Sequence, residues 1–190
     1  FIFTPLERRR LSNGAYNKFN FNSMKISQLL IPDLIISNLR AQDHINALKK
    51  MAGILGEDWK GDESIHSLME HESMDGILLG TGSAIFHTLS EDVKDIKIVL
   101  AISKKGVPHP KRRKEFIHIF FLLISPIKDS GTHLQMLSRI EGLLLNRVIR
   151  HALSMSQNKE EILKILKREE EMGREIYIPL SKEDIFSTLG

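Results

Sequence analysis

The stretch FIHIFFLLIS, residues 116–125, is apolar almost without interruption. Its β-branched and aromatic side chains predict a strand, and the absence of polar alternation predicts that both faces of this strand are covered. The run is the longest apolar candidate in the chain, yet it has about half the length of a bilayer-spanning helix, so we expect no membrane insertion. A second run, IKIVLAIS at 96–103, predicts a neighbouring strand.

Outward from these strands, glycine and proline divide the chain into further elements. Upstream, GILLGTGSAIFHT at 76–88 reads as strand on both sides of Gly80 and Gly82. Downstream of Pro126, residues 128–153 predict one long helix with Ser130 or Thr132 as its N-cap, which places His133 in the first turn. The predicted inner stripe of that helix is Leu134, Leu137, Leu144, Leu145 and Val148.

Helix patterns recur elsewhere in the chain. A helix capped by Asp43 and ending near Leu55 is expected, with an inner face of Ile45, Leu48, Met51, Ala52 and Leu55. Residues 62–72 predict a shorter helix, and Asn158 starts another, with Glu161 completing a capping box. Helices and strands alternate without repeats, which predicts an α/β domain with a mixed sheet.

Composition and charge bound the class of protein. The 190 residues, 42% hydrophobic and 27% charged, fit one domain, which we place at 24–190 after a flexible N-terminal extension at 1–23. That extension holds four basic side chains and one acidic one, which accounts for the net charge of +3. A generally basic, nucleic-acid-binding surface is therefore not supported. With no cysteine, disulfides, thiolate metal sites and cysteine nucleophiles are excluded, and we expect a cytoplasmic location.

Two of the eight histidines are placed for chemistry. His87 follows a glycine-rich strand, and His133 opens a long helix. A strand end and a helix start can share the edge of the sheet at which α/β proteins place their sites. A helix N-terminus suits an anionic group, and imidazole is a nucleophile at neutral pH. Five of the others read as structural or solvated side chains: His44, His66, His109, His118 and His151.

Three segments in order resemble one family. GILLGTGSAIFHT, IKIVLAISKKGV at 96–107 and FIHIFFLLISPIKDSGTHLQMLSRI at 116–140 look like the enzyme IIA domain of the bacterial phosphotransferase system, fructose/mannitol type. The nitrogen-regulatory subgroup is resembled most. Residues 25–55 also resemble the opening of those domains, so the likeness covers about Met24 to Leu166. It implies a mixed β-sheet flanked by helices on both faces.

The resemblance also implies a chemistry. His87 corresponds to the family histidine that accepts a phosphoryl group from the phosphocarrier protein HPr or a nitrogen-branch analogue, and His133 to the second histidine beside it. Transport members pass the group to an enzyme IIB domain, whereas regulatory members signal by binding target proteins. No metal or organic cofactor is implied. The expected phosphate-binding residues are His71, Gly80, Gly82 and Thr132.

Several positions depart from the family pattern. Phe86 stands where a proline usually precedes the active histidine, His71 aligns with the family arginine, and Leu89 replaces an arginine or threonine. The segment usually read GIGNG is LLGTG. An imidazole binds an anion less strongly than a guanidinium, which can donate two parallel hydrogen bonds. These changes therefore weaken anion stabilisation around His87.

These departures leave alternatives open. The first is a degenerate binding module with the same fold and no transfer. Nucleic-acid binding through the basic loop KKGVPHPKRRKE, residues 104–115, lacks interleaved aromatic residues. A metal site at His71, His87 and His133 lacks a recognised ligand spacing. The sequence shows no fused membrane or enzyme IIB segment, which favours a regulatory protein over a sugar-specific component.

Overall fold

The computed structural model describes residues 24–56, 77–79, 82–110 and 114–172. The predicted extension at 1–23 and the helix expected at 62–72 lie outside these residues.

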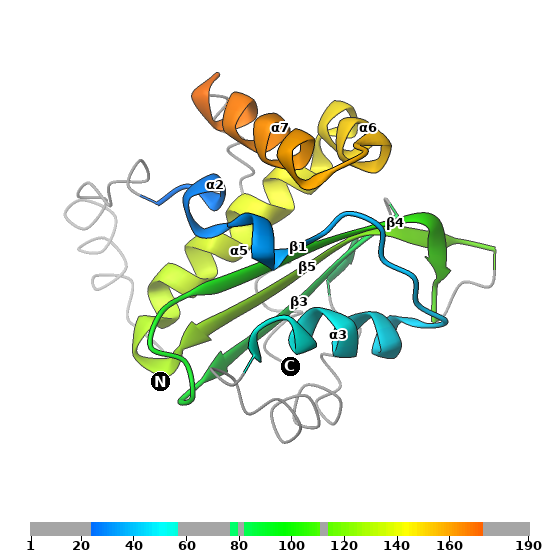
Figure 1. Cartoon of the computed structure of the whole chain (residues 1–190). Helices are drawn as coiled ribbons and strands as arrows, with labels where there is room; N and C mark the ends of the chain where they lie inside the picture. Colours follow the sequence, from blue (N-terminus) through cyan, green and yellow to red (C-terminus); the bar gives the residue numbers. More distant parts are fainter. Residues whose placement is uncertain (1–23, 57–76, 80–81, 111–113, 173–190) are drawn as a thin grey trace, which may run out of the picture.

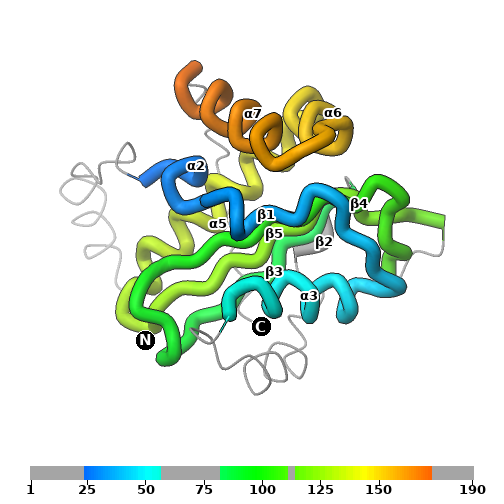
Figure 2. Tube along the Cα trace, in the orientation of Figure 1, coloured from blue at the N-terminus to red at the C-terminus, as the bar shows by residue number. Residues whose placement is uncertain are grey.

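A five-stranded mixed sheet forms the centre of the domain, with the strand order β1-β4-β5-β3-β2 (Figures 1 and 2). β1 runs parallel to β4 and β3 runs parallel to β5, whereas β4–β5 and β2–β3 are antiparallel pairs. The strands are β1 (Ile35–Ile36), β2 (Ile77–Leu79), β3 (Ser83–Ser90), β4 (Lys97–Pro108) and β5 (Phe116–Pro126).

Helices cover both faces of the sheet, as Figure 1 shows. One face packs against α2, α5, α6 and α7, and the other against α3. The predicted fold class is therefore confirmed. The helices are α2 (Ile26–Leu29), η1 (Pro32–Leu34), α3 (His44–Gly53), η4 (Ile127–Asp129), α5 (Ser130–Leu145), α6 (Arg147–Met155) and α7 (Lys159–Glu171).

The central strand β5 divides its side chains between two cores. Ile119, Phe121 and Leu123 pack into the core under α5, whereas Phe120 and Leu122 pack into the core against α3. Successive side chains of a strand point to opposite faces, so a strand covered on both sides needs apolar residues at every position. The prediction drawn from residues 116–125 is confirmed.

Two predicted N-caps are confirmed. The Asp43 side chain accepts a hydrogen bond from the backbone N–H of Asn46 at 2.7 Å, which caps α3. The Asn158 side chain accepts from the backbone N–H of Glu161 at 2.8 Å and caps α7. The predicted capping box is not formed: the Glu161 carboxylate accepts from the backbone N–H of Gln157, one residue before the cap, and not from that of Asn158.

The predicted start of the long helix is wrong. Neither Ser130 nor Thr132 is its N-cap: Asp129 holds that position, without a side-chain capping bond. The reason is that the short turn η4 follows Pro126 directly, so helical geometry begins earlier than the polar residues suggest. His133 is consequently the fourth residue of α5.

The predicted inner stripe is confirmed at Leu137 and Leu144, which are buried, but it is wrong at its other three positions, and the predicted continuity of the helix is wrong. Leu134, Leu145 and Val148 are 64%, 47% and 71% exposed. The helix breaks at Asn146, whose side chain accepts from the backbone N–H groups of Val148 and Ile149 and so starts α6 in a new direction. The side chains of α5 that are buried are His133, Met136, Leu137, Ile140, Leu143 and Leu144.

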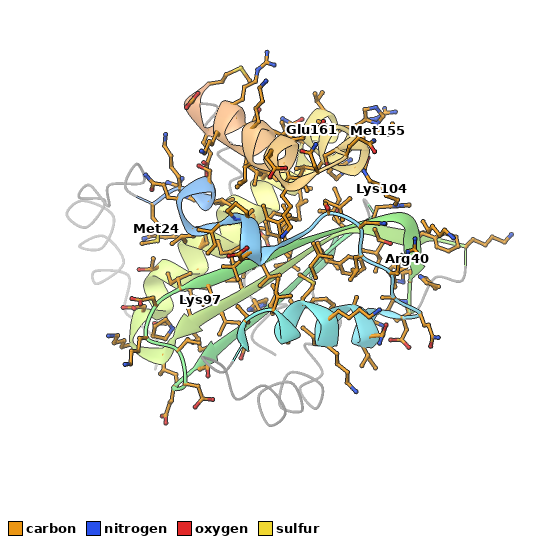
Figure 3. The ribbon with its side chains drawn as sticks, viewed as in Figure 1. Met24, Arg40, Lys97, Lys104, Met155 and Glu161 are labelled. Carbon is orange, nitrogen blue, oxygen red and sulfur yellow. The ribbon has the colours of Figure 1, made fainter. Side chains whose placement is uncertain are left out.

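The basic segment at 104–115 is only partly a loop. β4 continues to Pro108 through an irregularity between Ile102 and Val107. The Lys104 ammonium donates to the backbone carbonyls of Ser154 and Ser156, at the end of α6 (Figure 3). Lys104 therefore stabilises a helix C-terminus, where a cation is favourable.

We expect Gly106→Ala to destabilise the domain. Gly106 has a φ of 76°, and an added Cβ would lie 2.7 Å from Phe116 Cβ and 2.9 Å from His118 Cε1. Strain of this kind costs about 1–3 kcal/mol, which urea unfolding should show as a lower free energy of unfolding. Gly53→Ala is the control, because an added Cβ there meets nothing within 4 Å in a helix. A Gly106→Ala variant as stable as the control would contradict the packing described.

Candidate functional site

His87 lies in the second half of β3, on the face of the sheet that α5 covers. Ile85, two residues earlier, packs into the core under α5, whereas Phe86 packs into the core against α3. The alternation of a strand therefore turns His87 toward α5. Its register partner on the parallel strand β5 is Leu123, near the carboxyl end of that strand. His87 as a whole is half-buried.

His133 meets His87 from the first turn of α5. The distance between His87 Nδ1 and His133 Nε2 is 3.2 Å, and the ring centroids are 5.3 Å apart at an interplanar angle of 50°. His133 is only 4% exposed. The structure thus brings together the two histidines that the sequence singled out, and a hydrogen bond joins their rings.

Ser125 is a third member of the site, and the sequence analysis missed it. Its Oγ lies 2.9 Å from His133 Nδ1, and the residue is fully buried. Ser125 lies two residues beyond Leu123, the register partner of His87. The carboxyl ends of parallel strands meet at one edge of a sheet. A serine that ends the apolar run was therefore the available signal, once β3 and β5 were known to be parallel.

Burial keeps both rings neutral near pH 7. It lowers the pKa of His87 from its ordinary value of 6.5. The pKa of His133 is lowered to about 4, first by burial and then by repulsion from a charged His87. Two cations at this distance inside a protein are unfavourable, so a proton on one ring opposes a proton on the other.

Of these three side chains, only the imidazole of His87 could react with another molecule. Ser125 is sealed within the sheet and cannot meet a substrate, whereas His87 is at the accessible end of the chain of contacts. Nδ1 of His87 is engaged by His133, which leaves Nε2 for a visiting electrophile. A neutral imidazole with one nitrogen hydrogen-bonded and the other open is an activated nucleophile.

Of the other predicted phosphate-binding residues, Gly82 and Thr132 lie within the described part of the chain. Gly82 lies in a turn immediately before β3, five residues from His87, and strand rise puts it about 16 Å away. With a φ of 74°, Gly82 shapes that turn, and its carbonyl accepts from His118 N. Thr132 is half-buried and immediately precedes His133. His71 and Gly80 lie outside the described residues.

Phe86, which replaces the usual proline, is part of the sheet. It pairs with Leu122 of β5 and is 3% exposed. Its ring stacks on Phe120 at a centroid distance of 6.1 Å. A proline has no backbone N–H to contribute to a strand ladder, so Phe86 allows β3 to continue through His87 to Ser90.

Within residues 24–56, 77–79, 82–110 and 114–172, no group of three or more potential ligand side chains is arranged to hold a metal ion. No helix in this described part of the chain has both the length and the apolar character to cross a membrane.

Two curated proteins are similar in sequence. The fructose-specific EIIABC component of the phosphotransferase system from Bacillus subtilis is 27% identical over 146 residues, which is 75% of this chain and 23% of that protein. The nitrogen regulatory protein from Bradyrhizobium diazoefficiens is 25% identical over 145 residues, which is 75% of this chain and 95% of that protein. The chain thus spans under a quarter of the first relative and nearly all of the second.

Solved structures share the fold. The nitrogen regulatory protein IIA-Ntr from Neisseria meningitidis has a TM-score of 0.67 at 22% identity, over 74% of this chain and 98% of that one. The mannitol IIA of Escherichia coli has a TM-score of 0.61 at 17% identity, over 72% and 98%. The family description "Phosphoenolpyruvate-dependent sugar phosphotransferase system, EIIA 2" matches residues 28–169. With this match over most of its length, the chain belongs to the EIIA 2 family of the phosphotransferase system.

Proposed function

We propose that this protein accepts a phosphoryl group on Nε2 of His87 from an HPr-like phosphocarrier protein or a nitrogen-branch analogue. The observation that carries the proposal is the 3.2 Å contact between His87 Nδ1 and His133 Nε2. That contact occupies one nitrogen of the half-buried ring and leaves the other for the donor. Family membership supports the same assignment, because the matched residues include both histidines.

The proposed phosphoryl transfer needs only the donor and the two histidines. The lone pair of His87 Nε2 forms the new N–P bond, while the N–P bond of the donor phosphohistidine breaks and its electron pair returns to the donor nitrogen. The proton on His87 Nδ1 stays in the hydrogen bond to His133. Because the pKa of His133 is about 4, that ring takes no proton near neutral pH and acts as an acceptor. Negative charge on the phosphoryl oxygens lies near the N-terminal end of α5, whose dipole is favourable for an anion.

The similar proteins also bear on which partner receives the phosphoryl signal. A complex of mannitol IIA with phosphorylated IIB is among the structurally similar proteins, at 15% identity and a TM-score of 0.60. The similarity to nitrogen regulatory proteins, one of which the chain spans almost completely, supports a regulatory role over a sugar-specific one. We therefore propose a cytoplasmic regulatory protein that binds target proteins according to its phosphorylation state.

A second candidate function keeps the fold without the transfer. Leu89, which is 39% exposed, stands where the family often has an arginine or threonine, and His71 aligns with the family arginine. Leu89 offers no donor to a phosphoryl group, and an imidazole at position 71 is a weaker anion ligand than a guanidinium. A binding module that signals without phosphorylation fits these two positions.

Labelling separates the two functions. Incubation with phosphoenolpyruvate, the first enzyme of the system and HPr should add one phosphoryl group, seen by intact mass, and ³¹P NMR should place it on Nε2 of a histidine. His87→Ala should abolish labelling, because the nucleophile is lost, whereas His151→Ala, on an exposed part of α6, should be labelled like the wild type. An unlabelled wild type would leave only the binding module.

The lowered pKa of His87 predicts that phosphoryl acceptance persists to a lower pH than an exposed imidazole would allow. An imidazole of ordinary pKa 6.5 is mostly protonated at pH 6 and has no free lone pair. Burial lowers the pKa of His87, so a smaller fraction of its ring is protonated at that pH than of an exposed imidazole. With donor in excess, we expect the labelling rate to fall to half its value at pH 7.5 only at a pH below 6.5. A rate that falls with an apparent pKa of 6.5 or above would show that the ring is not desolvated.

A further inference from the structure

Three side chains form a continuous hydrogen-bonded chain from the interior of the sheet to its edge. Ser125 Oγ lies 2.9 Å from His133 Nδ1, and His133 Nε2 lies 3.2 Å from His87 Nδ1. Exposure increases along this chain, from 0% at Ser125 through 4% at His133 to the half-buried ring of His87. A group deep in the sheet is thus connected to the proposed nucleophile through a single imidazole.

The hydrogen bonds that link Ser125, His133 and His87 can run in either of two directions, depending on which atoms donate. Each neutral ring carries one N–H, so each ring donates through one nitrogen and accepts through the other. In the first direction His87 Nδ1–H donates to His133 Nε2, and His133 Nδ1–H donates to Ser125. In the second, Ser125 donates to His133 Nδ1, and His133 Nε2–H donates to His87 Nδ1. Only the first direction leaves a lone pair on His87 Nε2.

We propose that Ser125 is a positioning residue for phosphoryl acceptance: its Oγ accepts the Nδ1–H of His133 and thereby holds His87 as the Nδ1–H tautomer. The proposal rests on the function proposed above, since it explains why Nε2 is the reactive nitrogen. Ser125 touches no substrate and acts through His133. A hydroxyl can accept through its oxygen while it donates its own proton elsewhere, so this role leaves the serine proton available to another acceptor.

Removal of the Ser125 hydroxyl should reverse the direction of the hydrogen bond between His133 and His87. In Ser125→Ala the buried Nδ1–H of His133 has lost its acceptor, and an unpaired buried donor is unfavourable. The ring relieves this by carrying its proton on Nε2 instead. That proton then donates to His87 Nδ1, so the proton of His87 moves to Nε2 and blocks the nucleophile.

Histidine tautomers are directly visible in long-range ¹H–¹⁵N NMR spectra of the full chain. We expect Nδ1–H tautomers at His87 and His133 in the wild type and a shift of both toward Nε2–H in Ser125→Ala. The control is Ser83→Ala, at the start of β3. Ser83 is 1% exposed, and its Oγ has no hydrogen-bond partner among the residues that the structure describes. This control removes a buried hydroxyl from the sheet without touching the histidine pair, so its tautomers should match the wild type.

The rate of phosphoryl acceptance gives a second readout. With phosphoenolpyruvate, the first enzyme and HPr supplied as donors, Ser125→Ala should be labelled about fivefold more slowly, the factor that one neutral hydrogen bond supports. Ser83→Ala should be labelled at the wild-type rate.

The outcomes separate this inference from the function on which it rests. An Nε2–H tautomer at His87 in the wild type overturns the inference, and this measurement needs no variant to fold. Unchanged tautomers in Ser125→Ala also overturn it, even if labelling proceeds. If no variant is labelled and the wild type is not labelled either, the proposed transfer fails, while the tautomer shift still supports the serine's control of the pair.

Discussion

The hydrogen bond between His87 Nδ1 and His133 Nε2 depends on two features of the backbone that lie far apart in sequence. The first is the parallel pairing of β3 and β5, which brings His87 beside Leu123 at the carboxyl ends of the two strands. The second is the immediate passage from β5 through η4 into α5, which returns the chain over the same edge. Both rings meet there because a strand end and a helix start share one edge of the sheet.

The proposed chemistry requires that both histidine rings are uncharged. A histidine pair in open solvent would take up protons near pH 6.5 and would lose both the nucleophile and the acceptor. Here burial keeps the rings uncharged, and the lowered pKa of His133 makes it an acceptor that does not compete for the proton. On the opposite face of β3, Phe86 pairs with Leu122 and stacks on Phe120, and β3 continues past His87 to Ser90. Loss of the family proline therefore leaves the strand that holds the histidine intact.

Sequence patterns predicted the elements well where one local rule decides. An unbroken apolar run meant a doubly covered strand, and Asp43 and Asn158 were recognisable as caps. The helix after Pro126 failed because its inner face depends on tertiary contact: His133 and Met136 face the sheet, although Leu134 is more apolar than His133. The two histidines were identified from expected places at element ends, although β3 continues three residues past His87 to Ser90. Ser125 was not, because its link to His133 requires the register and the rotation of α5, which no local pattern contains.

The proposed chemistry requires that His87 and His133 are both neutral and are joined by one hydrogen-bonded proton. A scalar coupling between ¹⁵N nuclei across the hydrogen bond, from His87 Nδ1 to His133 Nε2, measures this directly in the unphosphorylated wild-type protein. We expect a resolvable coupling at pH 7, because the two nitrogens lie 3.2 Å apart with a proton between them. The absence of a coupling, together with two rings that titrate independently near pH 6.5, would contradict the pairing on which the proposed chemistry rests.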